Sequence, residues 1–438
     1  MKIRGSGVRY YVLAVLVAGY TLNAFDRSIL SLLLEPIRME FGASDTQLGL
    51  LSGLAFAAFY SLLSIPVAAL ADRWNRRNLL LIALLIWTLM TAMCGLAGSF
   101  MVLVLARAGV GIGEAGGNPT SHSLIADYFP APGRATALGI YALGAPAGAM
   151  LAGLFGGWGA EHLGWRSTLL MAAAPGLLLA PLLLLTVAEP RRPPPANAAQ
   201  VAFVPPLGVV LGNFWSQRSF RHLCIACALH SLAMYSASSF NPAYLTRMHG
   251  WSGSHVGQLI ALMGITGLIG TFLGGFITDR LGARGETRWQ LWIPGIATFA
   301  VIPVQLFCYL GAGSAMFAAF MASSLLSFVF FGPAYATVQS LATSRTRAVA
   351  AATMLFSKAM IGMGLGPLLV GVTSDLLAPI AGMGSLRLAL LLVPVFNLWA
   401  GVHFFVAARY FRAELSGVGA TGTVGMSGSS EPVPSPAR

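Results

Sequence analysis

Charged residues are scarce in this sequence of 438 residues. Asp, Glu, Lys and Arg together make up 9% of the chain, whereas soluble domains carry about 25%. Hydrophobic residues make up 56%, and the mean hydropathy is +0.75. So little charge excludes an ordinary soluble domain, and we expect a membrane protein.

Long polar segments are also rare. The chain instead repeats continuous apolar runs of the roughly 20 residues that a membrane-spanning helix requires. Such runs exclude a β-barrel, whose strands alternate apolar and polar residues in short segments. We therefore predict an all-α polytopic membrane protein. Its twelve expected spans are 9–34, 48–71, 78–98, 101–127, 134–158, 166–188, 219–246, 255–279, 289–311, 314–340, 348–376 and 386–410.

Cysteine is scarce as well. The four cysteines all fall within predicted spans, and Cys224-x-x-Cys227 has no second Cys/His pair nearby. A metal site is therefore not expected, and the thiols are interpreted as small hydrophobes. No Ser/His/Asp set, P-loop or dinucleotide fingerprint stands out either. We expect no enzyme activity, no metal and no organic cofactor.

The net charge of +12 has an uneven distribution. If the amino terminus is cytoplasmic, most Arg and Lys residues fall on the cytoplasmic side. Only Arg38, Arg166, Arg247 and Arg387 fall on the other side. This positive-inside bias predicts that both termini are cytoplasmic, and it explains the positive charge without a nucleic-acid partner.

The stretch "EPRRPPPANAAQ" divides the spans into two sets of six. Its prolines cannot continue a helix and favour an extended linker. We expect an amino-terminal bundle over 1–188, a cytoplasmic linker over 189–218 and a carboxy-terminal bundle over 219–410. The end of the linker could hold a short helix on the membrane surface. The Gly/Ser/Pro-rich tail, 411–438, is expected to be disordered.

The two halves carry related loops. "AALADRWNRR" follows the second span, and "GGFITDRLGAR" follows the eighth. Parallel six-helix repeats are an architecture of secondary transporters, which hold substrate between the repeats near the midplane. We interpret the acid-plus-arginine loops as a latch between the halves, with a simple topology signal as the alternative. The latch residues would be Asp72, Arg73, Arg76, Arg77, Asp127, Arg134, Asp279 and Arg280.

The first loop resembles the motif of the major facilitator superfamily between its second and third helices. Leu70, Ala71, Asp72 and Arg73 match, whereas Ala68 and Asn75 replace two glycines. This resemblance covers roughly residues 8–410. It implies the major facilitator fold, with twelve helices in two pseudo-symmetric six-helix bundles.

Four charges fall inside the first and fourth spans: Asp26, Arg27, Arg107 and Glu114. At about 1.5 Å per residue, Asp26 lies roughly 25 Å from the start of its helix and Arg107 roughly 8 Å below the outer surface. In a core about 30 Å thick these depths are similar, so the four charges could face one another. Intramembrane charges usually pair or line a cavity.

Two roles are open for this cluster. It could be a structural ion-pair network, or it could couple transport to protons. Arginine does not give up its proton in proteins, so Asp26 or Glu114 would be the proton carrier, and the proton would be the coupling ion.

"FDR" in the first span, "RAGVGIGEA" in the fourth and "ADYFP…R" after it resemble the spinster branch of the superfamily. That resemblance implies proton-linked transport of amphiphilic lipids such as lysophospholipids or sphingosine phosphate. It also carries the coupling role over to the four charges at the matching positions.

Lys358 is the only lysine after Lys2 and falls near the middle of the eleventh span. Snorkelling is difficult at that depth, so we expect it to bind an anionic headgroup. The other candidate substrate-binding residues are polar or aromatic side chains in predicted spans, together with one methionine. They are Phe56, Tyr60, Tyr141, His230, Tyr235, Asn241, Phe331 and Met354.

The leading hypothesis is a monomeric, proton-coupled lipid transporter in a bacterial cytoplasmic membrane, surrounded by membrane lipids. A second hypothesis is an antiporter for a soluble organic anion or a drug. A third, from another class, is a non-transporting receptor or channel.

Overall fold

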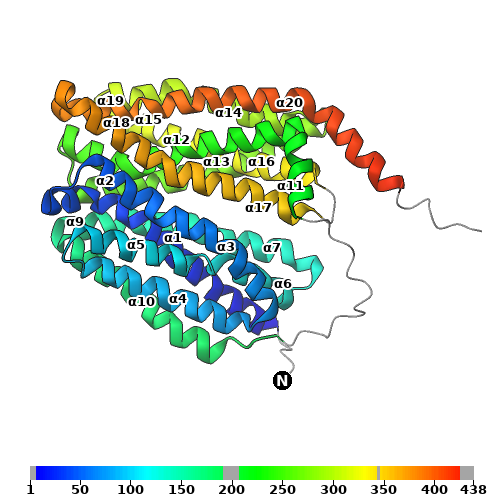
Figure 1. Cartoon of the computed structure of the whole chain (residues 1–438), viewed down its shortest axis with the longest axis horizontal. Coiled ribbons are helices and arrows are strands. Elements are labelled where there is room, and N and C mark those ends of the chain that lie inside the picture. Colours follow the sequence, from blue (N-terminus) through cyan, green and yellow to red (C-terminus); the bar gives the residue numbers. More distant parts are fainter. Residues whose placement is uncertain (1–5, 191–206, 343–345, 425–438) are drawn as a thin grey trace, which may run out of the picture.

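The computed structural model describes residues 6–190, 207–342 and 346–424. Every regular element within these ranges is a helix. The long helices run side by side in two bundles, one from each half of the chain (Figure 1). The predicted all-α membrane fold is confirmed.

The amino-terminal bundle contains six spans, several of which are divided by short breaks or π-helical turns. They are α1 (Ser6–Phe41); α2 (Asp45–Gly49), η1 (Leu50–Leu54) and α3 (Ala55–Arg73); α4 (Arg76–Gly95); α5 (Phe100–Glu114) and α6 (Gly117–Tyr128); α7 (Ala131–Ala142), α8 (Gly144–Leu151), η2 (Ala152–Gly156) and α9 (Gly157–His162); and α10 (Gly164–Thr186).

The carboxy-terminal bundle follows the short helix α11 (Leu207–Ser216). Its spans are α12 (Arg218–His249); α13 (Gly253–Gly282); α14 (Trp289–Leu310); α15 (Gly313–Phe328) and α16 (Phe331–Ser340); α17 (Arg347–Ser357), η4 (Lys358–Leu365) and α18 (Gly366–Ala381); and, after η5 (Gly382–Gly384), α19 (Ser385–Leu390) and α20 (Leu392–Val424).

Helix α20 extends beyond the last predicted span to Val424, whereas disorder was expected from residue 411. The segment "ARYFRAELS" accounts for the helix as far as Ser416, because it is rich in good helix formers and contains neither Gly nor Pro. Residues 425–438 lie outside the described chain.

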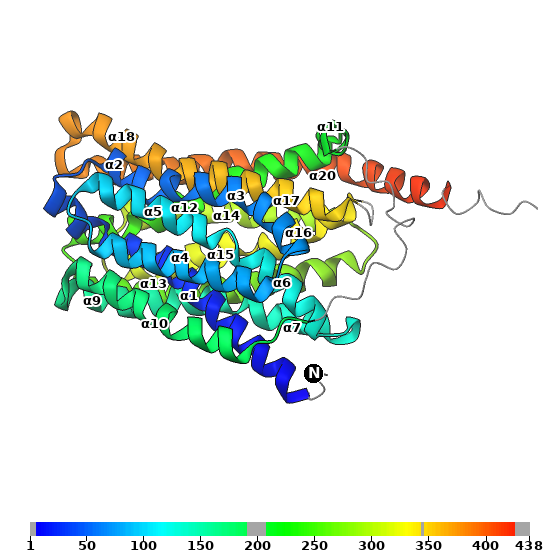
Figure 2. The ribbon, with the colours of Figure 1, turned by 60° about the horizontal axis from the view of Figure 1, so that its bottom comes forward.

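The bundles have two ends. We call the end where α1 begins the N-terminal side, and the end where it finishes, at Phe41, the far side (Figures 1 and 2). The positive-inside bias predicts that the N-terminal side is cytoplasmic.

The two halves pack against each other closely on the far side. A Cβ atom on Gly257 of α13 would lie 2.1 Å from the carbonyl oxygen of Gly153, and one on Gly157 would lie 2.3 Å from the carbonyl oxygen of Gly253. Glycines four residues apart on both helices therefore let the backbones touch, as in other membrane helix pairs. On the second seam, Gly49 approaches the carbonyl oxygen of Pro367 in the same way.

Hydrogen bonds show the same asymmetry. The hydrogen bonds that join described residues of the two halves gather on the far side. This end of the molecule therefore carries both the close glycine contacts and a polar network between the bundles.

We predict that Gly257→Ala opens the far side, because the added methyl group overlaps the backbone of Gly153. Spin labels on cysteines introduced at the exposed far-side positions Met39 and Ile380 should move apart by several ångströms in pulsed dipolar spectroscopy. The native cysteines are buried, so they should not take up label.

The matched control is Gly264→Ala on the same helix, where the nearest atom would lie 3.8 Å from the added Cβ atom. An equal change in both variants would contradict the idea that glycine contact controls closure.

Candidate functional site

An ion pair between α1 and α5 lies at the centre of the amino-terminal bundle. Arg27 Nε donates to Glu114 Oε2. The Glu114 side chain is fully buried, whereas 24% of the Arg27 side chain is exposed. The pair therefore has one end inside the bundle and the other at an accessible surface.

The glycine-rich sequence of α5 brings Glu114 to this place. A Cβ atom on Gly111 would lie 2.5 Å from the Phe56 carbonyl oxygen, and one on Gly113 would lie 2.5 Å from the Trp87 backbone nitrogen. The glycines thus let α5 press against α3 and α4, and Glu114 follows directly at the end of α5.

Asp26 has different surroundings although it is the neighbour of Arg27. Its carboxylate Oδ2 accepts a hydrogen bond of 3.1 Å from Thr91 of α4. Arg107 donates to the backbone carbonyl oxygen of Asp26, at 3.3 Å, and forms no ion pair with a described residue. The four charges lie together as expected, but only Glu114 is paired with an arginine.

Aromatic rings cover the two arginines. The guanidinium of Arg27 lies 5.2 Å from the centre of the Phe56 ring and 4.5 Å from that of Tyr60. The guanidinium of Arg107 lies 4.8 Å from the centre of the same Phe56 ring. These contacts have cation–π geometry, and they compensate part of the cost of burying each charge.

A second cation lies in the carboxy-terminal bundle. Lys358 is the first residue of η4 and is buried. Its ammonium lies 4.2 Å from the ring centre of Phe331, 4.9 Å from that of Phe330 and 5.3 Å from that of Tyr335. Within the described ranges it has no carboxylate partner.

The two cationic sites face each other between the bundles. Tyr335, which contacts Lys358, has Tyr20 and Tyr60 of the other half among its electrostatic neighbours. Tyr235 of α12 likewise lies within electrostatic range of Arg27. A band of tyrosines from both halves thus connects the two sites.

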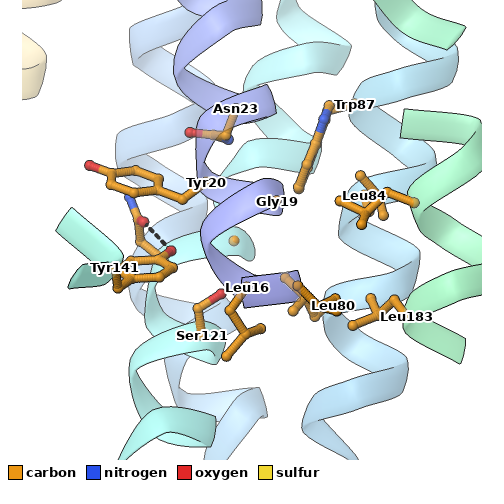
Figure 3. A pocket seen from close by; sticks show the side chains of 14 residues that line it. Leu16, Gly19, Tyr20, Asn23, Leu80, Leu84, Trp87, Ser121, Tyr141 and Leu183 are labelled. Atoms are coloured by element: carbon orange, nitrogen blue, oxygen red, sulfur yellow. Dashed lines mark hydrogen bonds between the residues drawn. The ribbon is translucent and has the colours of Figure 1, made fainter. Parts of the chain in front are cut away.

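A small pocket lies beside this band, between α1, α4, α6, α7 and α10. Its volume is about 20 Å³, which is enough for about one water molecule and far too little for an organic substrate. Tyr141 stacks on Tyr20 at 4.7 Å and donates a hydrogen bond of 2.8 Å to Asn118 at its edge (Figure 3).

Three of the candidate substrate-binding residues have contacts within the carboxy-terminal half. His230 is buried, its Nε2 donates to the Ser327 carbonyl oxygen at 2.8 Å, and its ring packs on Phe330. Asn241 accepts a hydrogen bond from Tyr309, and Met354 is fully buried in an apolar cluster. Sequence reasoning could not separate these residues from cavity residues, because both kinds occur in apolar helices.

The latch residues that the structure describes do not bridge the halves. Buried Arg76 pairs with Asp127 at 2.6 Å and with Glu189 at 2.9 Å, all within the amino-terminal bundle. The backbone N–H of Arg77 also donates to Glu189, and Arg134 donates to the Ala126 carbonyl oxygen. Arg73 is exposed, and Asp279 and Arg280 border a surface recess of the other half. The side chain of Asp72 lies outside the description.

A far-side network that the sequence analysis missed does join the halves. Arg247 of α12 donates to both carboxylate oxygens of Asp45, at 2.8 and 2.9 Å, and also pairs with Glu35. Ser374 donates to Asp45 at 2.6 Å, and Asp375 accepts from the first backbone N–H groups of α2. The only sequence signal was that Arg247 is one of few far-side arginines.

The sequence matches the Major Facilitator Superfamily over residues 16–367. The chain belongs to this superfamily. Among solved structures, a bacterial homolog to the human lysosomal transporter spinster, in an inward-facing and unoccupied conformation, is 30% identical. The match covers 94% of this chain and 99% of that one, with a TM-score of 0.83. The spinster resemblance is therefore confirmed.

Curated relatives are transporters rather than enzymes. An MFS-type efflux pump of Mycolicibacterium smegmatis is 33% identical over 401 residues, which is 90% of this chain and 91% of the relative. A sphingosine-1-phosphate transporter of Danio rerio is 25% identical over 427 residues, which is 91% of this chain and 83% of the relative. The present chain is thus a spinster-like transporter of the superfamily.

We predict that Asp45→Asn destabilises the protein by about 3 kcal/mol, because it breaks a buried ion pair that joins the halves. Thermal unfolding of the purified protein in detergent should show a lower midpoint.

Glu40→Gln provides the comparison, because Glu40 pairs with Arg166 on the same far side but within one half, where both side chains are exposed. That change should cost less than about 1 kcal/mol. Equal midpoints for the two variants would mean that the network does not hold the halves together.

Proposed function

We propose that this protein is a proton-coupled transporter of anionic amphiphiles, of the lysophospholipid or sphingosine-phosphate class, working by alternating access. The observation that carries the proposal is a pair of cations, Arg27 and Lys358, on opposite halves with aromatic rings between them. An anionic headgroup fits the cations, and an apolar chain fits the rings.

The state of the protein would be inward-facing. The halves touch closely on the far side, and the positive-inside bias assigns the N-terminal side to the cytoplasm. The similar solved structure is itself inward-facing. We extend the proposal to a monomer in a bacterial cytoplasmic membrane with both termini in the cytoplasm.

Glu114 is the better candidate for the proton carrier. Its carboxylate neutralises Arg27, so protonation of Glu114 would release the guanidinium for an anion. The Asp26 carboxylate accepts from Thr91 and is not paired with either arginine, so its protonation would release no cation. One oxygen of each carboxylate has no hydrogen-bond partner among the described groups.

This arrangement links proton and anion binding with a defined sign. Acidification would protonate Glu114, free Arg27 and strengthen binding of the anion. Lys358 would remain available throughout, because no acidic side chain in the described ranges pairs with it.

A second candidate function is export of a drug or a soluble organic anion. The relative that is 33% identical is an efflux pump, and two cations suit a soluble anion as well as a lipid. The aromatic band would then hold a planar apolar part of the substrate.

The test is uptake of labelled lysophospholipid by proteoliposomes of the purified protein under an imposed pH gradient. Lys358→Gln should lower the apparent affinity about tenfold or more, in line with the loss of a charged hydrogen bond. Lys358→Arg keeps the cation and should retain most of the flux.

Glu114→Gln should make binding insensitive to pH and uptake insensitive to the gradient, whereas Asp26→Asn should keep both dependences. Gradient-driven flux in Glu114→Gln would refute the assignment of the proton. Uptake of organic anions but of no lysolipid would favour the second function.

A further inference from the structure

Helix α11 lies across the N-terminal end of the carboxy-terminal bundle (Figures 1 and 2). Its inner face is fixed to the bundle. Val210 and Phe214 are buried, and the Phe214 ring stacks on Phe220 of α12 at 4.7 Å. An amphipathic helix in this orientation lies in the plane of a membrane surface.

The outer flank of α11 is apolar. Leu211 and Trp215 are four residues apart and so share one flank of the helix. They are 37% and 53% exposed. Tryptophan is enriched at the level of lipid headgroups, where its apolar ring and its N–H group both find partners.

Two arginines at the start of α12 lie beside this flank. Arg221 donates to the Trp215 carbonyl oxygen at 3.4 Å. Arg218 is exposed, and its guanidinium lies 5.1 Å from the ring centre of Tyr410 of α20. We call the set Leu211, Trp215, Arg218 and Arg221 the α11 corner.

Arg218 and Arg221 have no carboxylate partner among the described residues. The adjacent acid, Glu414, is occupied because its carboxylate accepts the backbone N–H groups of Arg218 and Ser219 at 2.8 and 3.0 Å. The corner therefore carries an excess of positive charge beside an apolar surface.

We propose that the α11 corner binds an anionic phospholipid of the surrounding bilayer. The guanidinium groups match the planar hydrogen-bonding geometry of a phosphate, and Leu211 and Trp215 contact the start of the acyl chains. A free phosphate would leave that apolar flank unused, so the chemistry selects a lipid. The site is on the outside of one bundle, separate from the cations between the halves.

The test is native mass spectrometry of the purified full chain with phosphatidylglycerol and with phosphatidylcholine of the same acyl chains. The wild type should bind phosphatidylglycerol more tightly. Arg218→Gln with Arg221→Gln should weaken that binding roughly 25-fold, about fivefold for each arginine near a membrane surface.

The matched control is Arg280→Gln with Arg284→Gln, which removes two exposed arginines from the same side of the same bundle. It should change the binding of phosphatidylglycerol by less than about twofold, because exposed charges that do not contact the lipid are screened by salt. An equal loss in the control, or equal binding of the two lipids by the wild type, would overturn the proposal.

Two further measurements keep the test decisive if the double variant does not fold. Binding of phosphatidylglycerol to the wild type should fall as salt is raised, and Trp215→Ser should weaken it without affecting binding of inorganic phosphate. Salt-independent binding, or complete displacement of the lipid by millimolar inorganic phosphate, would contradict an anionic lipid site.

Discussion

Arg247 extends from the far end of α12 into the opposite bundle, where Asp45 and Glu35 hold its guanidinium. This contact matters because two bundles of apolar helices have little else to fix their relative position. Lipid chains are as apolar as the helix surfaces, so specific polar contacts and close backbone approach must select the arrangement. The ion pair and the glycine contacts between α13 and η2 supply both on the same side.

Joining the halves at one end separates the functional groups from the contacts that hold the halves together. Arg27 and Lys358 lie on opposite bundles, and each is covered by aromatic side chains of its own half. Their cost in the membrane is met locally, by Glu114 for one and by three rings for the other. The halves could therefore change their relative position without leaving either cation uncompensated.

The two halves differ in how they treat charge although they share a fold. The amino-terminal half pairs its central arginine with a carboxylate, which can be neutralised by a proton. The carboxy-terminal half surrounds its lysine with the aromatic rings of Phe330, Phe331 and Tyr335. That difference gives the two halves different chemistry at their central cations: a carboxylate partner in one and aromatic rings in the other.

The sequence by itself determined the number of spans, the division into two halves and the residues that carry charge into the membrane. Those features follow from local composition, since each apolar run must cross the bilayer whatever its neighbours are. The depth of Asp26, Arg27, Arg107 and Glu114 followed from helix rise alone.

Only the tertiary structure decided which charges are partners. Rotation and tilt of α1 place Arg27 against Glu114 and Asp26 against Thr91, and no helical spacing within one segment contains that information. The same holds for Arg247 with Asp45 and for the buried positions of His230 and Met354. Partners from distant helices are chosen by three-dimensional packing, in which glycine contacts set how closely the backbones approach.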